Sequence, residues 1–192
     1  MKHMKFILLA VVAMVAASTV LWADGNKKKK NTTSTQTGTD STEIHWMTLD
    51  QVQEAMKKEP KKVYMDIYTD WCSWCKVMEK KTFSNANVIR YMNQKFYAVR
   101  LNAEQKDSIR FLGKMYGFVP EYKANQLAVD ILHGQMSYPT SVIFEENFLQ
   151  PQPVPGYLDV SNMEMILKYL GENTYKTVPF PDYQQGFKAT WN

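Results

Sequence analysis

Short apolar runs alternate with amphipathic segments along most of this chain, and the alternation predicts an α/β fold. Val63 to Tyr68 is a β-rich apolar run suited to a central strand, and Tyr97 to Asn102 is a second. Helical periodicity fills the space between them, from about Cys72 to Lys81 and again after Asn85, which we expect to cap the second helix. This strand, helix, strand order predicts a parallel crossover.

Further elements precede and follow this unit. Ile44 to Trp46 is a candidate first strand, and Thr48 with Gln51 forms a capping box that predicts a helix through about Lys58. Ser108 to Val119 carries apolar residues on both sides of a Leu-Gly-Lys turn, which predicts a β-hairpin.

The second half predicts two helices and two strands. Asn125 to His133 is expected to form a short helix ended by Gly134, and a buried strand follows Pro139. The run from Leu149 to Val154 contains two prolines, so it fits only an edge strand. A second capping box at Ser161–Glu164 predicts the start of the next helix.

The C-terminal segment predicts one more amphipathic helix, with Asp182 as its cap. Tyr183, Phe187 and Trp191 then fall on a single stripe. We interpret the stripe as a seal on the domain core, with a partner-binding face as the alternative.

The N-terminus has the order of a targeting signal. Residues 1–5 are basic, and an unbroken apolar run from Phe6 to Val15 precedes small residues, so 1–23 is expected to be a signal peptide or an uncleaved membrane anchor. Residues 24–42 are polar and lack apolar periodicity, which predicts a disordered linker to a single domain at 43–192. Either reading places the folded domain outside the cytoplasm, as a periplasmic, secreted or tethered protein.

Net charge does not indicate a nucleic-acid partner. The formal charge is +4, but six of the 23 Lys and Arg residues lie in the leader and in the block Lys27 to Lys30. The remaining 17 face 19 acidic residues, so the folded part is close to neutral.

Cys72 and Cys75 are the only cysteines, and their spacing at the start of a helix brings both sulfurs to one side. A structural disulfide is the first explanation for a cysteine pair outside the cytoplasm, but a loop this short removes little chain entropy. We therefore favour redox chemistry, assisted by the helix N-terminus, which favours a thiolate at Cys72. Three scattered histidines do not complete a zinc site, and no metal or other cofactor is expected.

Trp71-Cys-Ser-Trp-Cys-Lys76 resembles the Trp-Cys-x-x-Cys-Lys motif of the thioredoxin-like family, and Tyr138-Pro-Thr140 resembles its cis-proline segment. The resemblance covers roughly Val63 to Gly171. It implies a thioredoxin fold, a central mixed β-sheet flanked by helices, here with a β-hairpin insertion and an extra C-terminal helix. The pattern from Cys75 to Phe83 is similar to periplasmic thioredoxin-like domains, including the C-terminal domain of membrane thiol:disulfide interchange proteins.

The resemblance and the chemistry imply roles for five residues. Cys72, expected to be the more exposed sulfur, attacks a substrate disulfide, and Cys75 resolves the mixed disulfide. Asp66 is expected to be buried and to take the proton of Cys75, with a solvent-facing strand end as the alternative. Arg100 is the candidate cation beside it, or an exposed strand residue. Glu79, one helical turn after Cys75, would with Asp66 raise the thiol pKa values and favour a reducing protein; a solvated helix face is its alternative.

Substrate contacts are expected from four residues around the sulfurs. Trp71, Trp74 and Tyr138 would form an apolar collar, and Pro139, in the cis form, would present the backbone of Tyr138 to a substrate strand.

The sequence therefore predicts an extracytoplasmic thiol:disulfide oxidoreductase that reduces or exchanges disulfides of extracytoplasmic proteins and is re-reduced by a membrane thiol partner. Two alternatives stay open: a non-catalytic thioredoxin-fold binding module with an idle disulfide, and a thiol chaperone for metal or haem apoproteins.

Overall fold

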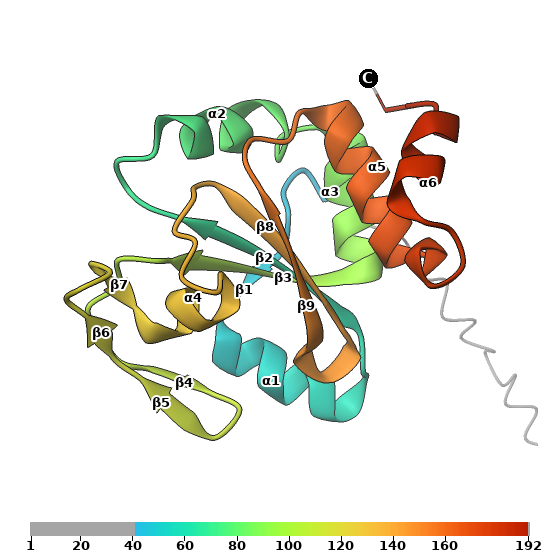
Figure 1. Cartoon of the computed structure of the whole chain (residues 1–192). Helices are drawn as coiled ribbons and strands as arrows, with labels where there is room; N and C mark the ends of the chain where they lie inside the picture. Colours follow the sequence, from blue (N-terminus) through green and yellow to red (C-terminus); the bar gives the residue numbers. More distant parts are fainter. Residues whose placement is uncertain (1–40, 192) are drawn as a thin grey trace, which may run out of the picture. The chain divides into compact units, whose positions relative to one another are not determined.

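Helices cover both faces of a five-stranded sheet in the computed structural model, which describes residues 41–191 (Figure 1). The order of the strands across the sheet is β1-β3-β2-β8-β9, with β1 and β2 parallel to β3 and with β8 and β9 antiparallel to their neighbours. The strands are β1 (Trp46–Met47), β2 (Lys62–Tyr68), β3 (Phe96–Asn102), β8 (Thr140–Glu145) and β9 (Leu149–Pro155). The predicted α/β class with a mixed central sheet is confirmed.

The predicted parallel crossover from β2 to β3 is present and runs through α2 (Ser73–Lys81) and α3 (Ala86–Lys95). Asn85 is the N-cap of α3, as predicted, since its side-chain oxygen accepts from two backbone N–H groups of the first turn.

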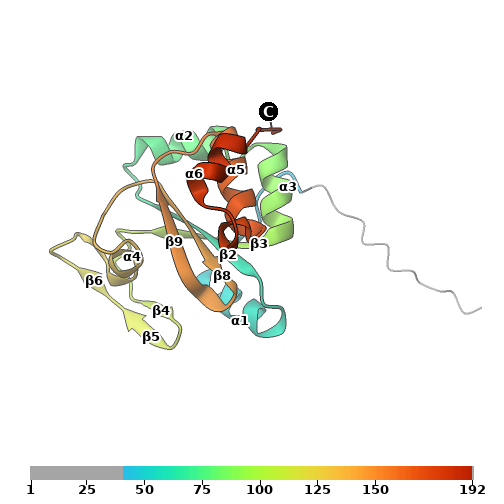
Figure 2. The same cartoon turned by 45° about the vertical axis from the view of Figure 1, so that its right-hand side comes forward.

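Two apolar clusters, one on each face of the sheet, form the core. Alternate residues of β2 supply them, because Tyr64 packs in one cluster while Met65 and Ile67 pack in the other. Helices α2, α3 and α5 (Val160–Gly171) cover the first face, and α1 (Leu49–Lys58) and α4 (Gln126–Ile131) cover the second (Figures 1 and 2).

The predicted hairpin is formed by β4 (Ile109–Phe111) and β5 (Lys114–Tyr116). Leu112 and Gly113 occupy the turn, both with positive φ, at 48° and 78°. Two consecutive residues at positive φ match the right-handed twist of a hairpin, and glycine adopts this conformation without steric cost. A second small pair, β6 (Phe118–Val119) with β7 (Ala124–Asn125), was not anticipated from the sequence.

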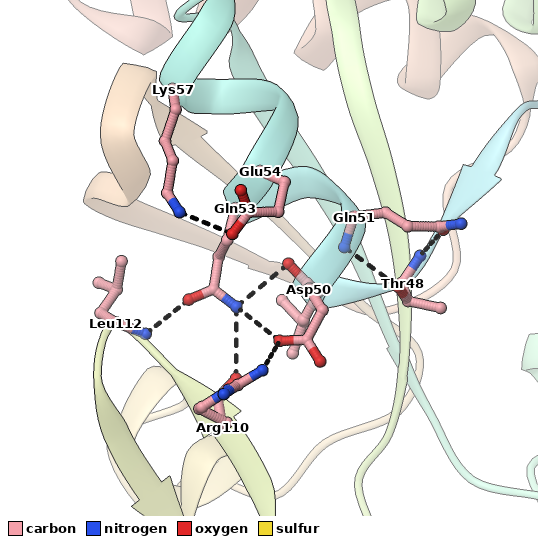
Figure 3. Close-up of polar contacts among 9 residues, drawn as sticks. Thr48, Asp50, Gln51, Gln53, Glu54, Lys57, Arg110 and Leu112 are labelled. Carbon is pink, nitrogen blue, oxygen red and sulfur yellow. Dashed lines mark hydrogen bonds and ion pairs between the residues drawn. The ribbon is translucent and has the colours of Figure 1, made fainter.

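The side chain of Gln53 fastens the hairpin to α1 (Figure 3). Its Oε1 accepts from the backbone N–H of Leu112 at 2.8 Å, and its Nε2 donates to the carbonyl of Arg110 at 3.3 Å. An ion pair between Arg110 and Asp50 at 3.6 Å lies beside these bonds. The insertion is therefore anchored by polar contacts in addition to its apolar face.

The first helix begins as predicted. Thr48 and Gln51 make both bonds of the capping box, and α1 ends at Lys58 (Figure 3). The preceding strand lies slightly later than expected, at Trp46–Met47, because Ile44 turns into the core and its carbonyl accepts from the N–H of Trp46.

The prediction of a capping box at Ser161–Glu164 is wrong. Asp159 is the N-cap of α5, since its carboxylate accepts from the N–H of Asn162 at 2.8 Å. Glu164 is instead completely buried and accepts from the backbone N–H groups of Thr190 and Trp191. The side chain of Glu164, which the local pattern assigned to the cap, therefore binds the distant C-terminal segment instead.

The last helix, α6 (Phe180–Gly186), is shorter than predicted. Pro179 precedes it, and Asp182 lies inside its first turn rather than at its cap. Phe187 follows the end of the helix, yet Trp191 still packs in the core with its ring centroid 5.2 Å from that of Tyr91. The chain end therefore covers the core, as the seal interpretation requires.

The short helix of the second half departs from its predicted bounds, whereas the edge strand is found as predicted. Helix α4 ends at Ile131 rather than His133, with Asn125 as its N-cap, and the chain leaves it through two residues at positive φ, His133 and Gly134. Strand β9 lies at the sheet edge and carries both prolines, as predicted.

The predicted leader at 1–23 and nearly all of the predicted linker at 24–42 lie outside the described residues. Within 41–191, none of the helices combines the length and apolar character needed to cross a bilayer.

Candidate functional site

The two cysteines lie where β2 gives way to α2. Cys72 is the N-cap of α2 and is bonded to Cys75 in a disulfide, with the two Cα atoms 5.3 Å apart. The N–H of Cys72 donates to the carbonyl of Thr69, which closes the turn between strand and helix. Each cysteine is only 4% exposed. The expectation that Cys72 is the more exposed sulfur is therefore wrong for this oxidised state, because the two residues are equally buried.

The two sulfurs differ in their hydrogen bonding. The backbone N–H of Cys75 donates to Sγ of Cys72 at 3.1 Å. Once the disulfide is reduced, an N–H aimed at this sulfur stabilises its thiolate, and the N-terminal end of α2 adds a favourable partial charge. This geometry favours a thiolate at Cys72 over one at Cys75.

Asp66 is buried on β2, with 1% exposure, which agrees with the buried expectation and not with the alternative of a solvent-facing strand end. Its Oδ2 accepts from Nε of Arg100 at 3.1 Å, and the two residues are in register on β2 and β3. Burial raises the pKa of Asp66 to about 6, although the charge and hydrogen bond of Arg100 oppose the shift. Its Oδ1 has no hydrogen-bond partner among the described residues.

Arg100 also binds a second carboxylate. Its Nη1 donates to Oε1 of Glu79 at 3.2 Å, and Glu79 is 56% exposed. The rings of Tyr68 and Trp46 lie 4.5 and 5.6 Å from the guanidinium carbon. Arg100 is thus the predicted cation beside Asp66. Arg100 compensates the negative charge of both carboxylates. The expectation that these two charges favour the reduced thiols is therefore weakened.

Exposed aromatic side chains flank the disulfide. Trp71 is 66% exposed and meets Tyr138 edge to face, with centroids 6.0 Å apart. Trp74 is 57% exposed and packs on Tyr157 at 5.2 Å. Tyr157 was missed by the sequence reasoning, because nothing near it in the sequence marks it as a neighbour of the cysteines.

Glu104 is a second missed residue. It accepts from Nε1 of Trp71 at 3.0 Å and so fixes the indole ring beside the disulfide. The peptide bond between Tyr138 and Pro139 is cis, and the carbonyl of Pro139 accepts from the N–H of Gly156 at 2.8 Å. This bond joins the proline segment to the loop that carries Tyr157.

The site is organised for thiol chemistry. In the part of the chain that the structure describes, no group of three or more His, Cys, Asp or Glu side chains could hold a metal ion. A helix-terminal disulfide, a buried carboxyl with a raised pKa and flanking exposed aromatics are suited to thiol–disulfide exchange with another protein.

Comparison with known proteins identifies a matching family model and similar proteins. The family model Thioredox_DsbH, described as a protein of unknown function (DUF255), matches residues 26–163. A segment of 89 residues is 36% identical to the thiol:disulfide interchange protein DsbD of Escherichia coli strain K12. That segment is 46% of this chain and only 15% of the relative, so the chain spans a small part of the curated relatives it matches.

Solved structures share the fold at low sequence identity. A protein described as DsbH oxidoreductase has a TM-score of 0.51 and 12% identity, covering 78% of this chain and 95% of its own. A thioredoxin-fold protein from Helicobacter pylori has a TM-score of 0.51 and 16% identity, covering 66% of this chain and 79% of its own. Together with the sheet topology, these similarities confirm the thioredoxin fold.

Proposed function

The chain belongs to the thioredoxin-like Thioredox_DsbH family, and from this premise we propose that it is an extracytoplasmic thiol:disulfide oxidoreductase. It reduces or exchanges protein disulfides through the Cys72–Cys75 pair. One observation carries the proposal: the disulfide lies at the N-terminus of α2, with the N–H of Cys75 aimed at Sγ of Cys72. This arrangement favours one attacking thiolate and one resolving thiol.

The reaction follows from these positions. The Cys72 thiolate of the reduced protein attacks one sulfur of a substrate disulfide, and the substrate's other sulfur leaves as a thiolate. Cys75 then gives its proton to Asp66 and attacks Sγ of Cys72, which releases the first substrate sulfur. The two substrate thiolates then take up two protons, one returned by Asp66 and one from solvent in place of the proton that Cys72 lost. The substrate has thus gained two electrons and two protons, and Cys72–Cys75 is again a disulfide. A dithiol donor must reduce it before the next cycle.

The partners follow from the same chemistry. Trp71, Trp74 and Tyr138 are proposed to contact the substrate backbone and side chains around its cysteine, with Pro139 beside them, and Tyr157 extends this collar. The natural substrates would be disulfide-containing extracytoplasmic proteins. The relatives named as thiol:disulfide interchange proteins support a membrane thiol reductant as electron donor.

Reduction of insulin disulfides by the pre-reduced protein, with dithiothreitol as final donor, tests the activity. We expect wild type to accelerate precipitation of the B chain, and Cys72→Ser to fall to the rate without protein. Ser73→Ala, between the two cysteines, is the matched control and keeps most of the activity. Equal rates for wild type and Cys72→Ser would reject the proposal.

The direction of transfer needs a separate measurement. Equilibration of Cys72 and Cys75 with glutathione buffers gives the reduction potential. A reductase is expected near the value of thioredoxin, about −270 mV, and a value near that of a strong oxidant, about −120 mV, would exclude the reductase role.

The low exposure of Cys72 favours a second candidate, a binding module whose disulfide is idle. In that case the partner would bind the aromatic collar without exchanging thiols. If dithiothreitol reduces the disulfide only when the protein unfolds, this candidate is the correct one; fast reduction of the folded protein excludes it.

A further inference from the structure

One guanidinium group serves two carboxylates of very different burial. Arg100 binds Asp66, which is 1% exposed, through Nε, and it binds Glu79, which is 56% exposed, through Nη1. The two bonds have nearly equal lengths, 3.1 and 3.2 Å. Neither carboxylate receives the pair of parallel N–H bonds that arginine can make to a carboxylate.

This sharing leaves Asp66 only partly satisfied. Its Oδ2 is bonded to Arg100, whereas its Oδ1 is buried and lacks a hydrogen-bond partner among residues 41–191. An unmade bond to a buried carboxylate oxygen is costly, so its persistence calls for a cause. The guanidinium N–H that lies beside Nε–H and could satisfy this atom is on Nη2, which makes no hydrogen bond among residues 41–191, whereas Nη1 is bonded to Glu79.

Aromatic rings limit the reorientation of the guanidinium. Tyr68, at 4.5 Å from its carbon atom, and Trp46, at 5.6 Å, both contact it. Contacts of this kind favour a fixed plane. Within that plane, the bond from Nη1 to Glu79 constrains the rotation of the guanidinium, and this rotation sets whether Nη2 reaches Oδ1 of Asp66.

We propose that Glu79 is a positioning residue, which holds Nη1 of Arg100 and thereby keeps the guanidinium turned so that Nη2 does not bond Oδ1 of Asp66 alongside the bond from Nε to Oδ2. Glu79 thus acts on Asp66 through Arg100, in addition to any direct effect of its own charge.

The consequence concerns the proton-accepting group of the proposed reaction, so the inference rests on the proposed function for its purpose. A carboxylate held by two guanidinium N–H bonds is a weak base, because its ionised form is strongly stabilised. With Arg100 shared, Asp66 keeps a pKa of about 6 and can still accept a proton near neutral pH. Glu79 follows Cys75 by four residues on α2, so the contact connects the helix that carries the thiols to the buried acid.

The groups that act on Asp66 come from three elements. Arg100 belongs to β3 and Glu79 to α2, while Tyr64 lies two residues earlier on β2 and has its own pKa raised by burial and by the charge of Asp66. Ser141, the neighbour of Asp66 on β8, is uncharged and bonds the hydroxyl of Tyr64 at 2.6 Å. The test uses the oxidised protein, in which Cys72 and Cys75 form a disulfide and do not titrate.

Carbon-13 NMR of the Asp66 carboxyl, titrated in the full-length oxidised protein, measures the effect without any enzymatic assay. We expect Glu79→Gln to lower the pKa of Asp66 by about one unit, because the released guanidinium can turn and give Asp66 a second bond from Nη2. The matched control is Glu54→Gln, an exposed helical glutamate paired with Lys57, which leaves the Asp66 titration unchanged.

Arg100→Gln separates the two routes by which Glu79 could act. In this background, Glu79→Gln is expected to shift the Asp66 titration by less than about a third of its effect in wild type, since only the screened charge of an exposed group remains. An equal shift in both backgrounds would show a direct charge effect, and no shift in wild type would also overturn the proposal.

If Arg100→Gln does not fold, a crystal structure of Glu79→Gln decides the question. The proposal requires a guanidinium N–H within hydrogen-bond distance of Oδ1 of Asp66, and an unchanged single bond through Nε refutes it. These readouts do not depend on thiol exchange. A protein inactive toward insulin but with the expected shift would thus refute the proposed function alone.

Discussion

Glu164→Gln should destabilise the domain far more than the loss of an ordinary helical glutamate. Glu164 is completely buried on α5 and is bonded to Nζ of Lys168 at 2.6 Å. It also accepts from the hydroxyl and the N–H of Thr190 and from the N–H of Trp191, at 2.5, 2.7 and 2.8 Å. One carboxylate therefore holds the end of the chain against the core.

The magnitude follows from the pKa of this carboxyl. Burial alone would raise it, but the hydrogen bonds from Lys168, Thr190 and Trp191 prevail and lower the pKa from 4.5 to about 2. At about 1.36 kcal/mol per pKa unit, the ionised form contributes roughly 3 kcal/mol. This stability is fully present above pH 4.5 and is lost as the pH falls through about 2, because the native state has the lower pKa.

Thermal unfolding at pH 7, followed by circular dichroism, measures the effect. A loss of roughly 3 kcal/mol corresponds to a fall in Tm of about 6–12 °C for a domain of this size. The matched control is Glu54→Gln, which removes a Glu–Lys pair on an exposed helix face and should leave the Tm nearly unchanged. If the two variants have the same Tm, the buried carboxylate does not hold the chain end as described.

Two further predictions concern other buried or bridging groups. Asp66→Asn should stabilise the oxidised domain above pH 6 by up to about 3 kcal/mol and have little effect below pH 4. The reason is that burial raises the native pKa of Asp66 from 3.8 to about 6, so ionisation of Asp66 opposes folding. Chemical denaturation across this pH range measures the difference in stability, and a pH-independent difference would contradict the reasoning. Gln53→Ala should speed hydrogen exchange at the Leu112 amide by about tenfold, because the N–H of Leu112 loses its acceptor. The amides of α3 should exchange as in wild type. An unchanged rate at Leu112 would show that apolar packing alone fixes the hairpin.

Local signals in the sequence predicted most of the secondary structure. Thr48 and Asn85 cap their helices because a cap needs only a side chain and the N–H groups two or three residues later. The same rule failed at Ser161, where Asp159 took the cap and Glu164 was recruited by the chain end. The capping pattern at Ser161–Glu164 looked as favourable as the one at Thr48–Gln51. The contact of Glu164 with the distant residue Trp191 explains why its side chain does not take part in a cap.

The candidate site divides in the same way. The cysteine pair, its position at the start of a helix and the proline before β8 were all legible in the sequence, because each depends on spacing along one short segment. The contacts of Tyr157 with Trp74 and of Glu104 with Trp71 could not be predicted, because they join segments that are far apart in the sequence.

By itself the sequence determined the fold class and the cysteine pair at the start of a helix, because hydrophobic period, caps and motif spacing are local properties. Asp66 and Arg100 were candidates implied by the resemblance to the thioredoxin-like family, each with an exposed alternative, and the tertiary structure decided that Asp66 is buried and paired with Arg100. Only the tertiary structure decided that both sulfurs are equally covered and that Arg100 is divided between Asp66 and Glu79. Exposure and the sharing of charge depend on which surfaces meet across the sheet, and the strength of an electrostatic interaction depends on that burial.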